Sequence, residues 1–309
     1  MTRRSRQGLV PHLLALALSL ALAGGAAAKP AMWIVRSSHA TLVLFGSIHL
    51  LPPGLDWRPS RLDDALAKAG ELWFELPITV KSDNEANSAV LARGALPAGG
   101  HLLELLTPDE AEKLREAAQM LHCQIEALDR MQPWMAEFTL SVAEDASGGA
   151  DAFNGVEEQV QAIAPLGAKR QAFETANQQI GFLAGAPVKD QIASLEWTLS
   201  EIDDDPASYR RVVDEWMAGD LAGLRRDAVE PLKAVSPTLY QRLIAERNRA
   251  WAKVLAGRLR RRGSIVVVAG IGHMIGPDGL PALLRARGFS VEGPDLSPDS
   301  GAQRASALH

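Results

Sequence analysis

Two histidines and one glutamate each end a short apolar run, and together they have the chemistry of a metal site. His49 and His273 both close a Gly-x-x-His motif directly after such a run, and Glu75 ends a third run. Imidazole nitrogens and carboxylate oxygens bind divalent metals, and three protein ligands leave a coordination position open for water or substrate. The residue types therefore predict metal-dependent chemistry, provided that the three runs end at one place.

The same residues also admit a structural interpretation. A single histidine after a strand is commonly a hydrogen-bonded structural residue, and Gly-x-x-His is a short motif. The repetition favours a site, because Gly46 and Gly270 open both copies and glycine allows a sharp turn and close approach of a ligand. Glu75 can serve in such a site either as the third metal ligand or as a general base.

The three runs must be strands of one sheet for this chemistry to assemble. The unbroken apolar run 264–269 predicts a strand covered on both faces, in the middle of a parallel or mixed sheet. Residues 32–36 and 41–45 predict a hairpin, and a helix over 60–70 joins the second of these runs to a strand at 71–76. We expect an α/β fold with a mixed, partly parallel β-sheet flanked by helices, whose ligands bind beyond the carboxyl ends of the strands.

The second half of the chain is predicted to be largely helical. Residues 176–262 show helical patterns interrupted by prolines, which indicates a helical layer or lid over the sheet. Residues 169–175 predict a fourth strand that ends on an acid, and Asp278 is expected to cap a last helix. Residues 78–100 show no firm pattern.

Two polar residues, Arg247 and Asn248, interrupt the apolar stripe of the helix that is expected to begin at Ser236-Pro237. A charge on an inward face must be paired or lie in a polar cleft. Two interpretations stay open: Arg247 forms a buried structural salt bridge, or it faces the site and steadies an acid or an oxyanion.

The N-terminus predicts export. Residues 1–28 combine a basic start, an apolar core and an Ala-x-Ala exit, which indicates a signal peptide cleaved after Ala28 and a periplasmic or secreted protein. The apolar core is short for a membrane span, so no stable membrane anchor is expected. Cys123 is the only cysteine, which excludes an intrachain disulfide. We expect one α/β domain over residues 29–292 and a disordered tail over 293–309.

The charge balance restricts the partners. The chain has 32 basic and 37 acidic residues, and removing residues 1–28 takes away three arginines and leaves 29 basic residues. This acidic balance argues against nucleic acid and against an anionic membrane surface. A peptide or other small substrate is the expected partner, and the oligomeric state stays open.

The order of several short motifs from about Trp33 to Val291 resembles the TraB/GumN family, which is related to the TIKI metalloproteases of animals. The motifs are Gly46-Ser-Ile-His49-Leu, the strand ending at Glu75, Gly155-Val-Glu157, Phe173-Glu174-Thr175-Ala-Asn-Gln178-Gln179, Glu246-Arg247-Asn248-Arg-Ala-Trp251 and Val268-Ala-Gly270-Ile-Gly-His273-Met-Ile-Gly-Pro-Asp-Gly279-Leu-Pro. The family commonly has Leu where this chain has Phe173 and Met274, changes that leave the proposed ligands intact. There is no His-Glu-x-x-His motif, so the chain does not resemble a zincin.

The resemblance implies a metal-dependent site. It assigns His49, Glu75 and His273 to the metal and gives Glu75 and Arg247 a catalytic part. The TIKI branch is proteolytic with Mn²⁺ or Co²⁺, and Zn²⁺ suits the same ligands. We take as supporting residues Gly46, Gly270, Asn248, Glu157 and Glu174.

The first hypothesis is therefore that the protein is a metal-dependent hydrolase, specifically a peptidase. The alternative is a non-catalytic periplasmic binding or accessory protein for haem, metal or a polysaccharide-related ligand. A purely structural accessory protein is a third possibility.

Overall fold

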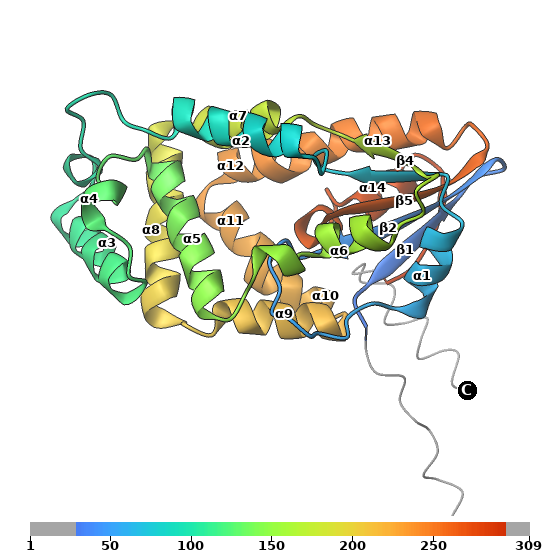
Figure 1. The fold of residues 1–309 in the computed structure, drawn as a ribbon, viewed down its shortest axis with the longest axis horizontal. Coiled ribbons are helices and arrows are strands. Elements are labelled where there is room, and N and C mark those ends of the chain that lie inside the picture. The colour runs from blue at the N-terminus through green and yellow to red at the C-terminus, as the bar shows by residue number, and fades with distance from the viewer. Residues whose placement is uncertain (1–28, 295–309) are drawn as a thin grey trace, which may run out of the picture.

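The computed structural model describes residues 29–294, in which six strands form one sheet in the order β4-β3-β5-β2-β1-β6 (Figure 1). The strands are β1 (Met32–Arg36), β2 (Ala40–Ser47), β3 (Glu71–Phe74), β4 (Lys169–Ala172), β5 (Gly263–Gly270) and β6 (Ser290–Glu292). Strands β4, β3, β5 and β2 run parallel, whereas β1 pairs antiparallel with β2 and β6. The mixed, partly parallel sheet that the sequence predicts is therefore confirmed.

Strand β5 occupies the middle of the sheet although it is nearly the last strand in the sequence. It pairs along its whole length with β2, with Ser47 opposite Gly270, and it pairs with β3 on its other side. Side chains 265–269 are at most 1% exposed, as expected for a strand covered on both faces. This pairing places the ends of β2, β3 and β5 next to one another at the same edge of the sheet.

Helices cover the sheet and pack against its strands to form an apolar core. The helices that contribute side chains to this core are α1 (Ser60–Ala67), α6 (Val156–Ile163), α9 (Ser208–Ala218), α10 (Leu221–Leu224), α11 (Glu230–Val235), α12 (Pro237–Tyr240), α13 (Glu246–Arg258) and α14 (Leu280–Arg285). A π-helical segment, Gln241–Ala245, joins α12 to α13. The helical character expected for residues 176–262 is confirmed.

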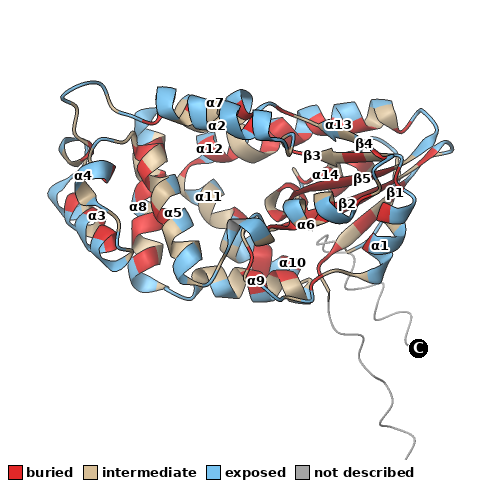
Figure 2. Cartoon of the chain, in the orientation of Figure 1, coloured by how far each residue is buried: buried red, intermediate tan, exposed pale blue. Residues whose placement is uncertain are grey.

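A second apolar cluster lies away from the sheet, on the left in Figure 1. It is built by four helices that we call the helical lobe: α3 (Pro108–Met120), α4 (Ile125–Leu128), α5 (Pro133–Ser147) and α8 (Val188–Asp204). In Figure 2 the buried residues of α5 and α8 form a layer separate from the buried strands. Between this lobe and the sheet, α2 (Val80–Arg93) packs on α7 (Ala176–Ala184).

Three local features differ from the sequence-based expectations. Helix α2 lies within 78–100, where no firm pattern was visible, because it buries only the small side chains of Ser82 and Ala89. Strand β4 ends at Ala172, two residues before its acid. Asp278 does not cap α14, which begins at Leu280 and has Gly279 as its N-cap residue. The Asp278 carboxylate instead accepts a hydrogen bond from the Tyr240 hydroxyl.

The predicted signal peptide lies outside the described residues, and so does the tail beyond Pro294. No helix within residues 29–294 is both long enough and apolar enough to cross a bilayer.

Candidate active site

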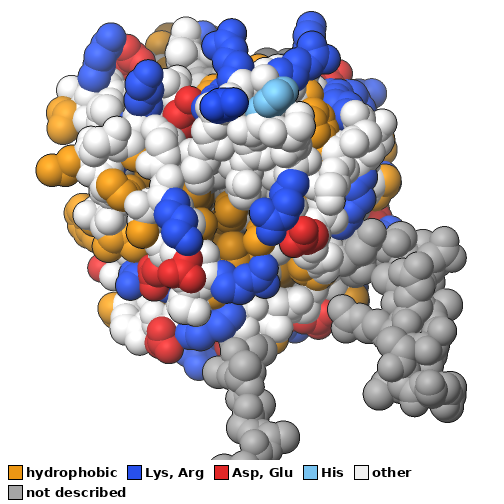
Figure 3. Space-filling model, turned by 90° about the vertical axis from the view of Figure 1, so that its right-hand side faces the viewer, with side chains coloured by type: hydrophobic (Ala, Val, Ile, Leu, Met, Phe, Trp, Pro, Cys, Tyr) orange, Lys and Arg blue, Asp and Glu red, His pale blue; other side chains and the backbone are white. Residues whose placement is uncertain are grey.

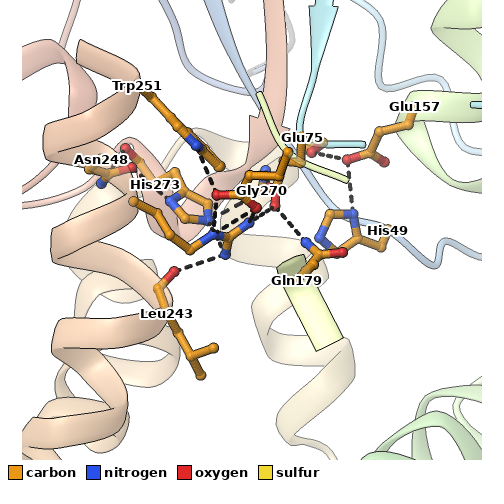
Figure 4. A network of polar contacts seen from close by, with 12 residues as sticks. His49, Glu75, Glu157, Gln179, Leu243, Asn248, Trp251, Gly270 and His273 are labelled. Carbon is orange, nitrogen blue, oxygen red and sulfur yellow. Dashed lines mark hydrogen bonds and ion pairs between the residues drawn. The ribbon is translucent and has the colours of Figure 1, made fainter. Parts of the chain in front are cut away.

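The residues predicted to form a site come together beyond the carboxyl ends of the parallel strands (Figure 4). His49 follows β2 and Glu75 follows β3. Gly270 is the last residue of β5 and His273 follows it, while Arg247 reaches them from α13. His273 Nε2 lies 3.7 Å from Glu75 Oε1. The repeated Gly-x-x-His motifs therefore meet because their strands are neighbours in the sheet, although more than 200 residues separate them in the sequence.

Glu75 is held from several sides. Its Oε1 accepts the backbone N–H of Gly270 at 2.8 Å, and its Oε2 accepts Arg247 Nη2 at 2.6 Å and Gln179 Nε2 at 3.1 Å. A Cβ at Gly270 would lie 3.3 Å from both Glu75 Oε1 and His49 Nε2. Glu75 Oε1 and His49 Nε2 therefore both lie close to Gly270, and a side chain at this position would crowd them.

Gly46 has a different function. A Cβ at this position would lie 2.3 Å from Ile271 Cδ1, so the glycine allows β2 to pack closely against the segment after β5. It supports the site through packing and does not border the ligand atoms themselves.

Asn248 fixes the tautomer of His273. Its Nδ2 donates to the carbonyl oxygens of His273 and Asp278, at 3.2 and 2.8 Å, so its Oδ1 is the atom that faces His273 Nδ1 at 2.7 Å. Nδ1 must then carry the proton, and the lone pair of His273 lies on Nε2. That lone pair is directed toward the side on which Glu75 lies.

Glu157 orients His49 in a similar way. Its Oε1 lies 2.8 Å from His49 Nδ1 and also accepts the hydroxyl of Ser47 at 2.5 Å. Nδ1 is therefore the donor, and Nε2 is the nitrogen that faces Glu75. A carboxylate behind an imidazole is the usual arrangement that orients a metal-binding histidine.

The segment that carries His49 is fixed along its backbone. Four of its carbonyl oxygens accept hydrogen bonds from other parts of the chain. The bonds are Trp216 Nε1 to Gly46 (2.8 Å), Val156 N to Ile48 (3.1 Å), the Tyr209 hydroxyl to Leu50 (3.0 Å) and Asp151 N to Leu51 (3.1 Å). The position of the ring is thereby determined although its side chain is 63% exposed.

Arg247 uses all five of its N–H groups within the protein. Nε and Nη2 form a bidentate pair with Glu174, and Nη2 also donates to Glu75. Nη1 donates to the carbonyl of Leu243 at 2.9 Å and to His273 Nε2 at 3.1 Å. The two interpretations left open by the sequence therefore combine, because Arg247 forms a buried ion pair and this ion pair lies in the site.

Sequence reasoning gave no role to Trp251, which supports three site residues at once. Its ring lies 4.4 Å from that of His273 and 4.8 Å from the guanidinium of Arg247, and its Nε1 donates to Glu174 at 2.9 Å. Its place in the inward stripe of α13 was visible in the sequence. Gln179, from α7, was not assigned a role either, and nothing in its local pattern indicates that it reaches Glu75.

The environment changes the pKa of two buried groups in opposite ways. Burial by itself raises the pKa of Glu75, but the positive charges of His273 and Arg247 outweigh it and lower the pKa to about 2. Burial lowers the pKa of His273 to about 4. His273 is consequently charged only in the acid range in which Glu75 titrates, and at neutral pH it is neutral and Arg247 keeps Glu75 ionised.

His49 and Glu157, which form an ion pair on the solvent-exposed side of the site, have the opposite shifts in pKa from those of His273 and a buried carboxylate in isolation. The charge of Glu157 raises the pKa of His49 to about 9. Burial by itself raises the pKa of Glu157, but the charge of His49 outweighs it, so the net shift is downward. Because the His49 side chain is largely exposed, solvent screens part of this attraction.

The donor atoms suit a divalent ion. Two ligands that each lie about 2.1 Å from one ion are about 3–4 Å apart, and the 3.7 Å between His273 Nε2 and Glu75 Oε1 is within that range. The three carboxylates of Glu75, Glu157 and Glu174 exceed the single permanent charge of Arg247. Across residues 29–294, however, no three His, Cys, Asp or Glu side chains already form a metal-binding set. The chemistry of the site therefore fits an ion, although a complete set of ligands is not preformed.

Comparison with known proteins places the chain in a family. An uncharacterized protein of Treponema pallidum (strain Nichols) is 22% identical over 271 residues, which cover 82% of this chain and 80% of that protein. No solved structure matches. The model of the TraB/PrgY/gumN family matches residues 31–293, a range that contains every site residue described above. The chain belongs to the TraB/PrgY/gumN family.

Proposed function

We propose that this protein is an exported, metal-dependent hydrolase that acts on peptides. One observation supports the proposal most strongly: Nε2 of His49, Nε2 of His273 and one carboxylate oxygen of Glu75 face the same region, and each of these groups is held from behind by another hydrogen bond. A bound ion would replace the Nε2 proton of His49 and the N–H that Arg247 donates to His273 Nε2. Preorganised ligands of this kind are typical of catalytic metal sites. The peptide as substrate class is inferred from the resemblance to the TIKI metalloproteases.

His49, His273 and Glu75 are the residues that would hold the ion in this proposal. A bound divalent ion would supply an acidified water and would polarise a carbonyl group. The carboxylates of Glu75, Glu157 and Glu174 exceed the positive charges of Arg247 and protonated His49 by one, and this excess favours such an ion because uncompensated buried charge is costly.

Glu75 suits the role of a ligand better than that of a general base. A general base works best when its pKa lies near the working pH, whereas the pKa of Glu75 is lowered to about 2. The same hydrogen bonds that lower its basicity fix the direction of Oε1. The charges of His273 and Arg247 therefore support the ligand role of the two roles that the sequence leaves open.

Arg247 acts as a positioning residue. Its guanidinium fixes Glu75 through one N–H and is itself fixed by a bidentate pair with Glu174. All its donors have protein acceptors, which favours orientation of Glu75 over direct contact with a substrate oxyanion.

Metal content tests the proposal directly. Purified wild-type protein is loaded with Mn²⁺, Co²⁺ or Zn²⁺, and bound metal is measured together with hydrolysis of a peptide library. We expect one ion per chain and metal-stimulated hydrolysis, both lost in His49→Ala and His273→Ala with unchanged thermal unfolding. His39→Ala is the matched control, since His39 is an exposed residue between β1 and β2.

Two results would contradict parts of the proposal. A wild-type protein that takes up no metal would exclude the site as a metal centre. Stoichiometric metal without any metal-stimulated hydrolysis would favour the non-catalytic binding protein.

A further inference from the structure

A second candidate binding region lies at the opposite end of the strands from the active site. A groove of about 940 Å³ runs between α13 and the start of strands β3 and β4. The lining residues on which the inference depends are Trp73, Lys169, Lys253, Val254, Arg261 and Arg262. In Figure 3, which faces this end of the molecule, Lys and Arg side chains gather along the upper part of the surface.

Four cations in this groove lack a carboxylate partner. Lys169, Lys253, Arg261 and Arg262 are exposed, and in the described part of the chain their side chains form no ion pair or hydrogen bond. A set of unpaired like charges repels itself, and the repulsion is relieved when an anion binds. The concentration of positive charge is notable in a chain whose net charge is −5.

Among residues 29–294, Glu71 is the one acid that lines the groove, and it is already neutralised by Arg258. Both carboxylate oxygens of Glu71 accept Arg258 Nε, at 2.9 and 3.0 Å, and Oε2 also accepts Trp73 Nε1 at 3.0 Å. Arg258 in turn donates to the carbonyl oxygens of Arg261 and Arg262, which fixes the course of the backbone there. The four other cations are thereby left to face the groove without competition.

Stabilisation of a helix end does not explain this arrangement. Basic residues at the end of α13 complement the helix dipole, and Arg260 belongs to the same run. Lys169, however, comes from β4, almost 90 residues earlier in the chain, and Arg260 does not line the groove. The groove therefore collects charge from three segments: β4, α13 and the turn between α13 and β5.

The remaining lining is apolar. Val254 is 46% exposed, and the Trp73 ring is partly exposed beside it. An anion with some apolar or ring-shaped body would cover these side chains while its oxygens reached the cations.

We propose that this groove binds a ligand that carries several phosphate or carboxylate groups. Arginine and lysine bind such oxyanions through charge-assisted hydrogen bonds. The groove shares no residue with the candidate active site, so binding of an anion in the groove does not depend on whether the protein is a hydrolase.

Calorimetric titration of the full chain with inorganic tripolyphosphate tests the proposal. The titration contains a chelator, which prevents phosphate from binding through a metal. We expect saturable binding that weakens by roughly tenfold or more in Lys253→Gln/Arg261→Gln, because two charge-assisted contacts are removed. Arg260→Gln is the matched control and should bind like wild type, and so should His273→Ala.

Vesicles distinguish the possible sources of the anion. Cosedimentation with vesicles that contain phosphatidylglycerol, but not with pure phosphatidylcholine, would identify a lipid headgroup as the natural source if tripolyphosphate competes. Binding of tripolyphosphate without cosedimentation would indicate a soluble ligand. The proposal is wrong if neither probe binds, if the double variant binds as tightly as wild type, or if Arg260→Gln loses as much affinity.

Discussion

Asn248 determines which nitrogen of His273 is available. Its amide is held by two backbone carbonyls, so its oxygen can only accept, and the imidazole must present Nε2 to the site. The sequence shows an asparagine on the inward face of a helix, and the structure shows that this asparagine orients His273. Asn248 thus acts on the site through His273 and needs no contact with a ligand.

Replacing Asn248 should weaken the site through this histidine. In Asn248→Ala the tautomer of His273 is no longer fixed, and the buried carbonyl of His273 and the half-buried carbonyl of Asp278 lose their donor. We expect metal affinity to fall by about 10–100-fold and the free energy of unfolding to fall by about 1–3 kcal/mol. Metal titration and chemical unfolding measure the two effects. Asn84→Ala, on the exposed surface of α2, is the control, and unchanged metal affinity in Asn248→Ala would show that the tautomer does not depend on Asn248.

At the scale of elements, the sequence predicts the strands well and their supporting contacts poorly. The apolar runs before His49 and His273 are distinctive because buried parallel strands need continuous apolar residues. Helix α2 was missed because its buried face holds only small side chains. Trp251 lies in the inward stripe of α13, which the sequence shows, whereas Gln179 reaches the site only through the packing of α7, which no local pattern encodes.

One contact inside the helical lobe should make its stability depend on pH. Glu137 of α5 accepts hydrogen bonds from Ser194 Oγ at 2.6 Å and from Thr198 Oγ1 at 3.4 Å, both on α8. Burial raises the pKa of Glu137 from 4.5 to about 7, although the two hydroxyls oppose the shift. A carboxyl whose pKa is higher in the folded protein stabilises the fold fully below pH 4.5, and this stabilisation is lost as the pH rises through 7.

The substitution Glu137→Gln tests this dependence. The amide keeps an oxygen that accepts from Ser194 and cannot ionise. We expect the free energy of unfolding to rise by about 1–3 kcal/mol at pH 8 and to change much less at pH 5. Denaturant unfolding at both pH values measures the difference. Glu126→Gln, on the exposed face of α4, should show no such pH dependence, and an equal gain at both pH values would contradict the assignment.

At the scale of the whole molecule, the sheet cannot be completed until most of the chain is present. Strand β5 pairs with both β2 and β3, so without it the two strands that carry His49 and Glu75 have no common neighbour. The sequence indicates that residues 264–269 form a central strand, but it does not indicate which strands lie beside it. That order follows from the right-handed crossovers and the packing of the helices.

Truncation tests this dependence. A chain that ends at residue 262 lacks β5 and should show no cooperative thermal unfolding and little protection of amide hydrogens in β2 and β3. A chain that ends at residue 294 keeps every described element and should unfold like the full-length protein. Native-like protection of β2 in the shorter chain would show that the sheet can form without its central strand.

The late position of β5 in the sequence also affects how the chain folds while it is being synthesised. About 190 residues separate the end of β3 at Phe74 from the start of β5 at Gly263, and at about 5–20 residues per second their synthesis takes roughly 10–40 s. During that interval the apolar edges of β2 and β3 exist without their partner, and an unpaired apolar edge can pair with another chain. We therefore expect a nascent chain of this protein to depend on protection from aggregation until β5 has been made.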